Sequence, residues 1–336
     1  MSISERLLHP LDAGLIPLAV GTPLSILRAK PSAALTKRTG VSAVQTYKPH
    51  AVALEQMGIR LIETPENNLP LIAVEITRSK RETLGLIALA VKHLDSAGWC
   101  LVDGAKGDGI DSILKTLRAT FPNVESYSKA HGRVIWFQPG AVRPEEINVW
   151  ADAVAPRKLP NGYITQAGVF SEDSIDEGSA FLVEHLPPSL SGEGADLGAG
   201  WGYISAEILK KATSIQSLHL FEAEQLALTC SKHNVSDPRA TFVWSDVTRD
   251  ELGEFDFILM NPPFHTERAA DEKLGQSFIR AAAGALKRNG TIYMVANRHL
   301  PYEKVLDEHL VEWQEVAKNN RFKVFHAQCP KSKPRG

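Results

Sequence analysis

The sequence is poor in cysteine, in long apolar runs and in net charge, and each shortage argues against a class of protein. Its 336 residues contain three cysteines, Cys100, Cys230 and Cys329, and no C-x-x-C pair, which argues against a disulfide framework and a structural zinc site. The longest apolar runs, such as residues 15–20, are far shorter than the ~20 residues that cross a bilayer. Because no basic segment leads into an apolar one near the start, we expect no signal peptide. The short apolar runs predict no membrane association, and the absence of metal-ligand spacing predicts no bound metal. A cytoplasmic protein is the simplest interpretation.

What is present is an ordinary globular composition, with 43% hydrophobic and 23% charged residues, and a length typical of two domains. Residues 138–162 contain four prolines and two glycines with little periodicity, so we place the domain boundary there, between domains at 1–150 and 155–336. The formal net charge is −2, but residues 1–160 hold 19 Lys and Arg against 15 Asp and Glu, whereas residues 161–336 hold 18 against 24. This asymmetry suggests that the first half binds a partner, although sampling noise explains it equally well.

In the second half, strand-like and helix-like segments alternate, which predicts an α/β fold with a parallel sheet. A short turn at residues 318–320 separates two final strands at 312–317 and 321–327, so the last strand should run antiparallel to its neighbour. The remaining strands are expected at 194–197, 218–222, 241–244, 256–260 and 291–296, and the helices at 177–187, 202–212, 224–234, 270–287 and 302–309.

The first half contains a partial echo of the second. Residues 90–106 match 283–298 as a helix, a glycine-containing turn and a buried strand, with Gly98 opposite Gly290. Downstream, residues 133–137 lie where 321–325 lie in the second half. Two anchors at similar offsets of about 190 residues suggest a duplicated domain.

A glycine-rich turn, Asp196-Leu-Gly-Ala-Gly-Trp-Gly202, ends one expected strand and opens a helix. Glycines at 198, 200 and 202 permit a tight turn and allow backbone N–H groups to approach a ligand. Glu222 follows at the end of the next strand, where a carboxylate can accept both ribose hydroxyls of a nucleoside cofactor. The turn suits NAD, FAD or S-adenosylmethionine or is merely structural, but its G-x-G-x-G spacing differs from the dinucleotide fingerprint and disfavours NAD.

Asp246 follows the third expected strand of this half. A carboxylate at this position can accept the exocyclic amine of an adenine. An equally good alternative is that it caps the turn at residues 247–251.

Asn261-Pro262-Pro263-Phe264 follows the apolar fourth strand, at the carboxyl edge where open α/β sheets bind ligands. The two prolines fix the backbone and have no N–H to donate, which leaves their carbonyl groups as acceptors. The set suits a planar nitrogen-bearing substrate, whose two N–H bonds point to the Asn261 amide oxygen and the Pro262 carbonyl while Phe264 stacks on the ring. We therefore expect all four residues to be catalytic.

With these motifs in view, the second half resembles class I S-adenosylmethionine-dependent methyltransferases of the N-P-P-[FY] type, and in particular the RsmC family of ribosomal RNA guanine-N2 methyltransferases. The segments that carry the resemblance are GVFSEDSIDEGS (168–179), DLGAGWG (196–202), MNPPFH (260–265), ANRHLPYEKVLDEHL (296–310) and RFKVFHA (321–327). Glu222 is a departure, because many relatives have Asp at that position.

The resemblance implies two tandem Rossmann-like methyltransferase domains, the second with a seven-stranded, mostly parallel sheet whose last strand is antiparallel. It implies a degenerate first domain, and where the echo predicts a catalytic loop the chain has Glu75-Ile-Thr-Arg-Ser-Lys80 in place of N-P-P-F. S-adenosylmethionine is the implied cofactor. Its expected contacts are Phe170, Asp196, Gly198, Gly200, Gly202, Glu222, Asp246 and Asn261; in the segment of Phe170, a plain helix cap is the alternative.

We therefore predict methyl transfer to the exocyclic N2 of a guanine in ribosomal RNA, most simply 16S rRNA, by a monomer that acts on the RNA or the small subunit. Alternatives are a protein glutamine methyltransferase, an adenine-N6 methyltransferase and a non-catalytic RNA-binding assembly factor. The first domain is expected to bind RNA phosphates. Its candidate contacts are Arg28, Lys30, Lys37, Arg38, Arg78, Lys80 and Arg81.

Overall fold

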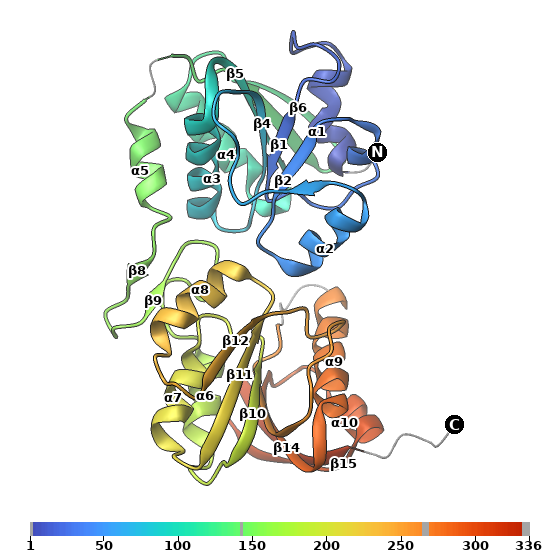
Figure 1. The fold of residues 1–336 in the computed structure, drawn as a ribbon, viewed down its shortest axis with the longest axis vertical. Helices are drawn as coiled ribbons and strands as arrows, with labels where there is room; N and C mark the ends of the chain where they lie inside the picture. The colour runs from blue at the N-terminus through green and yellow to red at the C-terminus, as the bar shows by residue number, and fades with distance from the viewer. Residues whose placement is uncertain (1–2, 142–143, 264–268, 331–336) are drawn as a thin grey trace. The chain divides into compact units, whose positions relative to one another are not determined.

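A computed structural model describes residues 3–141, 144–263 and 269–330. The chain divides into two compact units, one of Met1–Pro156 with Gln166–Gly168 and the other of Arg157–Thr165 with Val169–Gly336 (Figure 1). The first division lies inside the proline-rich segment 138–162, and the chain then returns briefly to unit 1. No helix within the described ranges is long and apolar enough to span a membrane.

Unit 1 contains a seven-stranded sheet in the order β3-β2-β1-β4-β5-β7-β6, with only β7 and β6 antiparallel to their neighbours. Apolar clusters cover both faces, one under α3, α4 and α5 and the other under α1 and α2. The elements are α1 (Ile3–Asp12), β1 (Leu24–Leu27), the 3-10 helix η1 (Leu35–Lys37), β2 (Val41–Val44), α2 (Lys48–Gln56), β3 (Arg60–Leu61), β4 (Leu69–Glu75), α3 (Lys80–His93), β5 (Leu94–Ala105), the 3-10 helix η2 (Lys106–Asp108), α4 (Ile110–Thr120), β6 (Glu125–Lys129), β7 (Gly132–Phe137) and α5 (Glu146–Asp152).

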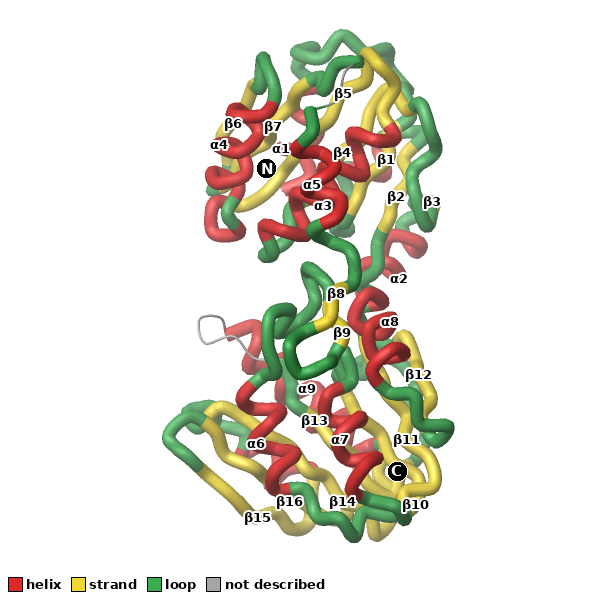
Figure 2. The backbone as a smooth tube through the Cα atoms, turned by 90° about the vertical axis from the view of Figure 1, so that its left-hand side faces the viewer, coloured by secondary structure: helices red, strands yellow, loops and turns green. Residues whose placement is uncertain are grey.

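Unit 2 repeats this sheet in the order β12-β11-β10-β13-β14-β16-β15, preceded by a two-stranded hairpin, β8-β9. Figure 1 shows the sheet between α6, α7 and α8 on one side and α9 and α10 on the other, and Figure 2 shows α6 and α7 crossing in front of its strands. The elements are β8 (Arg157–Lys158), β9 (Ile164–Thr165), α6 (Glu177–His185), β10 (Gly192–Leu197), α7 (Tyr203–Lys211), β11 (Ile215–Glu222), α8 (Gln225–Asn234), β12 (Ala240–Trp244), β13 (Phe255–Met260), α9 (Ala269–Gly284), β14 (Leu286–Asn297), α10 (Glu303–His309), β15 (Leu310–Lys318) and β16 (Phe322–Pro330).

The expected fold class is confirmed, because both units have the same α/β topology and the sheet of unit 2 is parallel except for β16 and β15. The expected helix at 270–287 is too long at its C-terminal end: α9 stops at Gly284 and β14 already begins at Leu286.

Gly98 and Gly290 occupy equivalent places in β5 and β14, as the echo predicted. A Cβ at Gly98 would lie 2.9 Å from the Leu69 carbonyl oxygen, and a Cβ at Gly290 would lie 2.9 Å from the Phe255 carbonyl oxygen, at the start of β4 and β13. Both strands therefore need glycine where the neighbouring backbone comes close. The second anchor is two residues out of register, since the strand pairing places Phe137 opposite Cys100 and Ala327, not Phe325, opposite Ile292.

Candidate functional site

The expected site lies at the carboxyl edge of the unit 2 sheet, where the strand order reverses. β10 pairs with β11 on one side and with β13 on the other, so the loops that follow β10 and β13 leave the sheet in opposite directions. Such a switch point opens a crevice in which α/β proteins bind ligands. The glycine-rich turn after β10 and Asn261 after β13 meet there and line one pocket.

The glycine-rich turn has the backbone shape that its sequence predicts. Gly198, Gly200 and Gly202 have φ values of 73°, 56° and 87°, in the left-handed region that side chains disfavour. The N–H groups of Gly198 and Ala199 donate to the Phe221 carbonyl, at 2.9 and 3.0 Å, and Gly202 is the N-cap of α7. The turn is thus fixed against β11 and leads into a helix N-terminus, which favours negative charge nearby.

Glu222 is anchored to this turn by its carboxylate. Its Oε2 accepts a hydrogen bond from the Gly200 N–H and its Oε1 accepts one from the Glu224 N–H, both at 2.8 Å. Burial raises the pKa of Glu222, and backbone hydrogen bonds from Glu224, Gly200 and Ala223 oppose that shift. Each oxygen keeps a lone pair that can accept a further hydrogen bond.

Asp196 lies beneath the turn and is fully buried. Its Oδ2 accepts a hydrogen bond from Ser205 Oγ at 2.7 Å, whereas its Oδ1 receives none from any residue that the structure describes. Burial raises the pKa of Asp196 to about 7. A buried carboxylate in this state is poised to gain from a cationic partner.

Asn261 is the best-defined polar group of the site. Its Nδ2 donates to Asp176 Oδ2 and to Ser179 Oγ, both at 2.9 Å. Its Oδ1 is buried and accepts no hydrogen bond within the described part of the chain. Pro262 is buried and Pro263 exposed, whereas Phe264 and His265 lie outside the described residues.

The pocket at this edge gathers only some of the expected residues. Phe170, Gly198, Gly200 and Asn261 line it. Asp196, Gly202, Glu222 and Asp246 are not in its lining, although Glu222 accepts a hydrogen bond from the lining residue Gly200. The other lining residues are Ser171, Asp176, Ser179, Ala199, Trp201, Tyr203 and Ile204.

Trp201 was not among the expected site residues. Its Nε1 donates to the Phe170 carbonyl at 3.1 Å, which ties the glycine-rich turn to the segment of Phe170. The Phe170 ring itself is 54% exposed, and Ser171 beside it has a φ of 54°. The aromatic residue inside the G-x-G-W-G turn is the signal that could have found this link.

Asp246 has the geometry of the capping alternative. Its Oδ1 accepts from the Thr248 N–H at 3.1 Å and from Thr248 Oγ1 at 2.7 Å, and its own N–H donates to Asp250. It therefore fixes the turn after β12. A contact of Asp246 with an adenine stays a prediction.

Among the described residues, no group of three or more His, Cys, Asp and Glu side chains could hold a metal ion.

Comparisons with known proteins agree with this geometry. Residues 161–326 match the methyltransferase small domain. The ribosomal RNA small subunit methyltransferase C of Shewanella sediminis is 31% identical over 269 residues, which are 77% of this chain and 77% of the relative. The protein of the same name from Shewanella baltica (strain OS195) is 32% identical over 250 residues, which are 72% of this chain and 71% of that relative. A solved T. thermophilus 16S rRNA N2 methyltransferase (RsmC), in complex with AdoMet and guanosine, has the same fold, with a TM-score of 0.79 over 96% of this chain and 91% of that chain at 21% identity.

Proposed function

Because this chain belongs to the ribosomal RNA small subunit methyltransferase C family, we propose that it transfers a methyl group from S-adenosylmethionine to the exocyclic N2 of a guanine in 16S rRNA. The observation that carries the proposal is the buried Oδ1 of Asn261 at the switch point, beside the glycine-rich turn, which accepts no hydrogen bond from the residues that the structure describes. An acceptor held there suits an N–H donor of a planar amine. The names of the relatives support ribosomal RNA of the small subunit as the substrate, and the guanosine in the T. thermophilus complex supports guanine as the base.

The pocket fits S-adenosylmethionine in its space and its polar groups. A Cβ at Gly200 would meet no described atom within 4 Å, so the backbone there is open to a ligand. Asp196, which lies near the end of β10 next to the lining residues, keeps a buried oxygen that lacks a donor among the described residues, and the cofactor carries ammonium and hydroxyl donors. When bound, it supplies a methyl group on a sulfonium centre. We propose that it is held by Phe170, Asp196, Gly198, Gly200, Gly202, Glu222, Asp246 and Asn261.

The chain's own contribution to the reaction is positioning. The lone pair of an aromatic amine is delocalised into the ring, which makes the nitrogen a poor nucleophile. If Asn261 Oδ1 and the Pro262 carbonyl accept its two N–H bonds and Phe264 stacks on the base, the nitrogen is drawn towards a pyramidal shape with its lone pair directed at the methyl group. Orientation of this kind contributes up to ~7–11 kcal/mol. The methylated nitrogen is acidic enough to lose its proton to water, so the mechanism needs no general base.

A base inside a helix cannot reach such a pocket, so the target guanine has to be flipped out or presented unpaired. The fold of unit 1 also separates the alternatives. The glutamine methyltransferases with a similar loop have a helical N-terminal domain, whereas unit 1 is built on a seven-stranded sheet.

Asn261→Ala tests the function directly. We expect the rate of methylation of 16S rRNA to fall at least ~100-fold, because the amine loses its acceptor, while S-adenosylmethionine still binds. The measurement is mass spectrometry of 16S rRNA nucleosides from cells that lack the protein and are complemented with each variant. Asn289→Ala, which removes an exposed amide of the same unit, is the control. Unchanged N2-methylguanosine in cells without the protein would exclude guanine N2 as the target.

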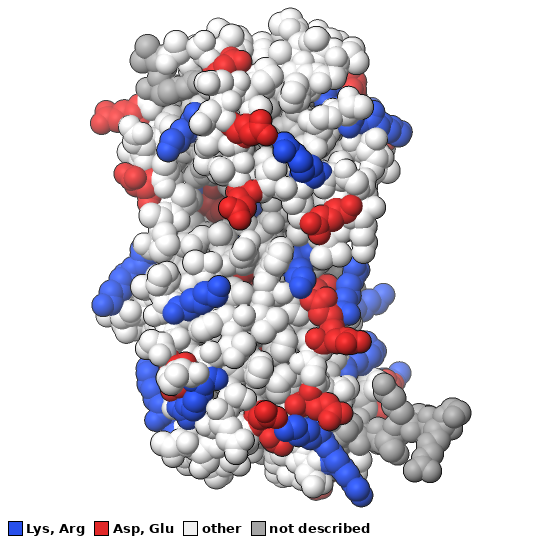
Figure 3. Space-filling model, viewed as in Figure 1, with Lys and Arg blue, Asp and Glu red and all other residues white. Residues whose placement is uncertain are grey.

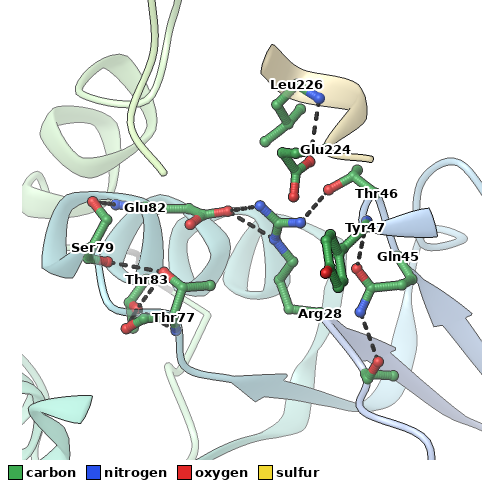
Figure 4. Close-up of polar contacts among 11 residues, drawn as sticks. Arg28, Gln45, Thr46, Tyr47, Thr77, Ser79, Glu82, Thr83, Glu224 and Leu226 are labelled. Atoms are coloured by element: carbon green, nitrogen blue, oxygen red, sulfur yellow. Dashed lines mark hydrogen bonds and ion pairs between the residues drawn. The ribbon is translucent and has the colours of Figure 1, made fainter. Parts of the chain in front are cut away.

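We further propose that unit 1 is a degenerate methyltransferase-like domain that binds RNA phosphates, whereas unit 2 is the catalytic domain. Arg28 has to be removed from its candidate contacts, because its side chain is only 10% exposed and pairs with Glu82 (Figure 4). Arg38 donates to the Thr22 carbonyl, and burial lowers its pKa. The better candidates are exposed at the carboxyl edge of the unit 1 sheet, Arg78 and Lys80 after β4 and Lys106 after β5.

On the face drawn in Figure 3, Lys and Arg are interspersed with Asp and Glu, without a large field of one sign. We place the RNA contact of unit 1 at the exposed cations named above, at the carboxyl edge of its sheet. We also propose that the protein acts in the cytoplasm as a monomer, on ribosomal RNA or on the small ribosomal subunit.

A further inference from the structure

We propose that Asp176 and Ser179 are positioning residues that hold the side-chain amide of Asn261 in the one orientation that presents its oxygen to the target amine. The proposal rests on the function proposed above and assigns to these two residues a part in the reaction that is separate from cofactor binding. It follows from the hydrogen bonds around Asn261.

The chemistry of the partners fixes which atom of the amide faces them. A carboxylate can only accept hydrogen bonds, so the Asn261 atom that lies 2.9 Å from Asp176 Oδ2 has to be the nitrogen. The second N–H of the same nitrogen is used by Ser179 Oγ. With the amide reversed, two oxygens would face each other and the nitrogen would be directed at the N–H groups of the substrate. Asp176 thereby excludes the orientation of the Asn261 amide in which no oxygen faces the substrate to accept a hydrogen bond from the amine.

The chain holds Asp176 itself in place through the first turn of α6. Asp176 is the N-cap of this helix, and the Oδ2 that faces Asn261 also accepts the Ser179 N–H at 2.7 Å. A Cβ at Gly178 would come within 3.1 Å of that oxygen and 3.2 Å of the Phe322 ring, so the glycine leaves the carboxylate room to occupy this position. One oxygen thus joins the helix start to a loop 85 residues further along the chain.

A helix cap alone would not need this second contact. Serine caps a helix as well as aspartate does, because capping requires only one acceptor for an N–H in the first turn. The hydroxyl of serine lies closer to its own backbone than a carboxylate oxygen, so it cannot serve the helix and Asn261 together. Asparagine keeps an oxygen at the reach of the carboxylate. The variants Asp176→Ser and Asp176→Asn therefore separate positioning from capping.

The experiment measures kcat and KM on small ribosomal subunits that lack the modification, together with the S-adenosylmethionine Kd by calorimetry and the Tm. We expect Asp176→Ser to lower kcat about tenfold, Asp176→Asn to retain most of it, and Asp176→Ser with Ser179→Ala to approach the loss of Asn261→Ala, all with Kd close to wild type. Ser179→Ala leaves the backbone cap intact and reports on the amide even if the Asp176 variants unfold. Ser277→Ala, which removes a hydroxyl bonded to the α9 backbone, is the matched control.

A double-mutant cycle makes the decision. In the Asn261→Ala background, Asp176→Ser should cause no further loss of kcat, because the group that it positions is gone. The proposal is wrong if Asp176→Ser with Ser179→Ala keeps the wild-type kcat, if the loss is the same in both backgrounds, or if a weaker S-adenosylmethionine Kd accounts for all of it. A wild-type protein that methylates no guanine N2 would instead overturn the proposed function.

Discussion

Each unit has a seven-stranded sheet of the same topology, and the two sheets differ in the residues at their carboxyl edges. Arg28 follows β1 as Gly198 follows β10: the Arg28 N–H donates to the Val44 carbonyl at 2.8 Å, and the Gly198 N–H donates to the Phe221 carbonyl at 2.9 Å. Arg28 even keeps the left-handed backbone, with a φ of 58° against 73° at Gly198. Unit 1 thus retains the turn but places a guanidinium where unit 2 has no side chain.

The position at which we expect a carboxylate to bind the ribose differs between the units in the same manner. Gln45 directly follows β2, at the place where Glu222 ends β11. Each Oε1 accepts the N–H two residues further on, Tyr47 at 2.9 Å and Glu224 at 2.8 Å. The Gln45 amide nitrogen donates to the Ala29 carbonyl, as Figure 4 shows, whereas the second oxygen of Glu222 accepts from the turn. Unit 1 has the same local turn, but the negative charge of the Glu222 carboxylate is absent because Gln45 is a neutral amide.

Glu75 stands at the position of Asn261, since each follows the last residue of its strand that pairs with the first strand of its sheet, Val74 with β1 and Met260 with β10. One of its oxygens accepts the Lys30 N–H at 3.1 Å, and the other accepts no hydrogen bond from the residues described here. Burial raises its pKa to about 7. The helix that follows the glycine-rich turn has also shrunk, from the nine residues of α7 to the three of η1. The two units therefore have the same fold with different residues at the site, because the buried strands specify the sheet and the residues just beyond them specify the site.

The largest effect that sharpens this comparison is expected from Arg28→Ala. Glu82, with a side chain only 5% exposed, would lose its charged partner, and breaking such a pair costs roughly 3–5 kcal/mol of the free energy of unfolding. Urea unfolding measures this loss. Arg28→Gly should be about 1 kcal/mol less destabilised, because glycine tolerates the left-handed backbone. A second S-adenosylmethionine site in the Arg28→Gly protein, seen as a calorimetric stoichiometry of two, would show that one residue alone separates the units.

A smaller effect is expected at the ends of β11 and β2. Glu222→Ala should weaken S-adenosylmethionine binding by ~1.5–3 kcal/mol, the value of hydrogen bonds to a charged group. Gln45→Ala is the matched control, since it removes the same local hydrogen bond to an N–H two residues on, but in unit 1. Calorimetry should find its affinity unchanged. An equal loss in both variants would mean that Glu222 acts only through the fold.

The smallest effect concerns the cations of unit 1. Changing Arg78, Lys80 or Lys106 to Gln should lower the log–log salt dependence of RNA binding by about 0.7 for each phosphate that the protein no longer neutralises. Lys92→Gln is the control, because this exposed lysine lies in the last turn of α3, at the opposite edge of the sheet. Filter binding over a range of salt concentrations gives the slopes. Identical slopes for all four variants would argue against RNA binding at this edge.

The strands of unit 2 were predictable because their apolar runs end at recognisable turns, and each expected strand lies within an observed one except at Arg321. Most of unit 1 was not predictable from its likeness to unit 2, because the sequence offset between equivalent residues of the two units changes along the chain. The offset is 170 from Arg28 to Gly198, 177 from Gln45 to Glu222, 186 from Glu75 to Asn261 and 192 from Gly98 to Gly290. A search at one offset finds only the last of these.

The site was predictable where a residue type carries the chemistry by itself, as with Asn261. The contact between Asn261 and Asp176 was not, because a motif describes neighbours in sequence and this hydrogen bond joins a helix start to a distant loop. Asp196 and Glu222 were found for their carboxylates. Only the structure shows that the Gly200 N–H of the turn already donates a hydrogen bond to one carboxylate oxygen of Glu222, and that Asp196 is fully buried.

The return of the chain to unit 1 at Gln166–Gly168 means that no single cut can dissect the molecule. A protease that cleaves after Pro156 would leave three residues of unit 1 covalently attached to the other fragment. These residues are more than a tether, because Gly168 lies so close to the Glu82 carboxylate that even a methyl group would overlap it. A first half that ends at Pro156 therefore lacks the backbone that lies against the Glu82 carboxylate, and a fragment meant to reproduce unit 1 has to include Gln166–Gly168.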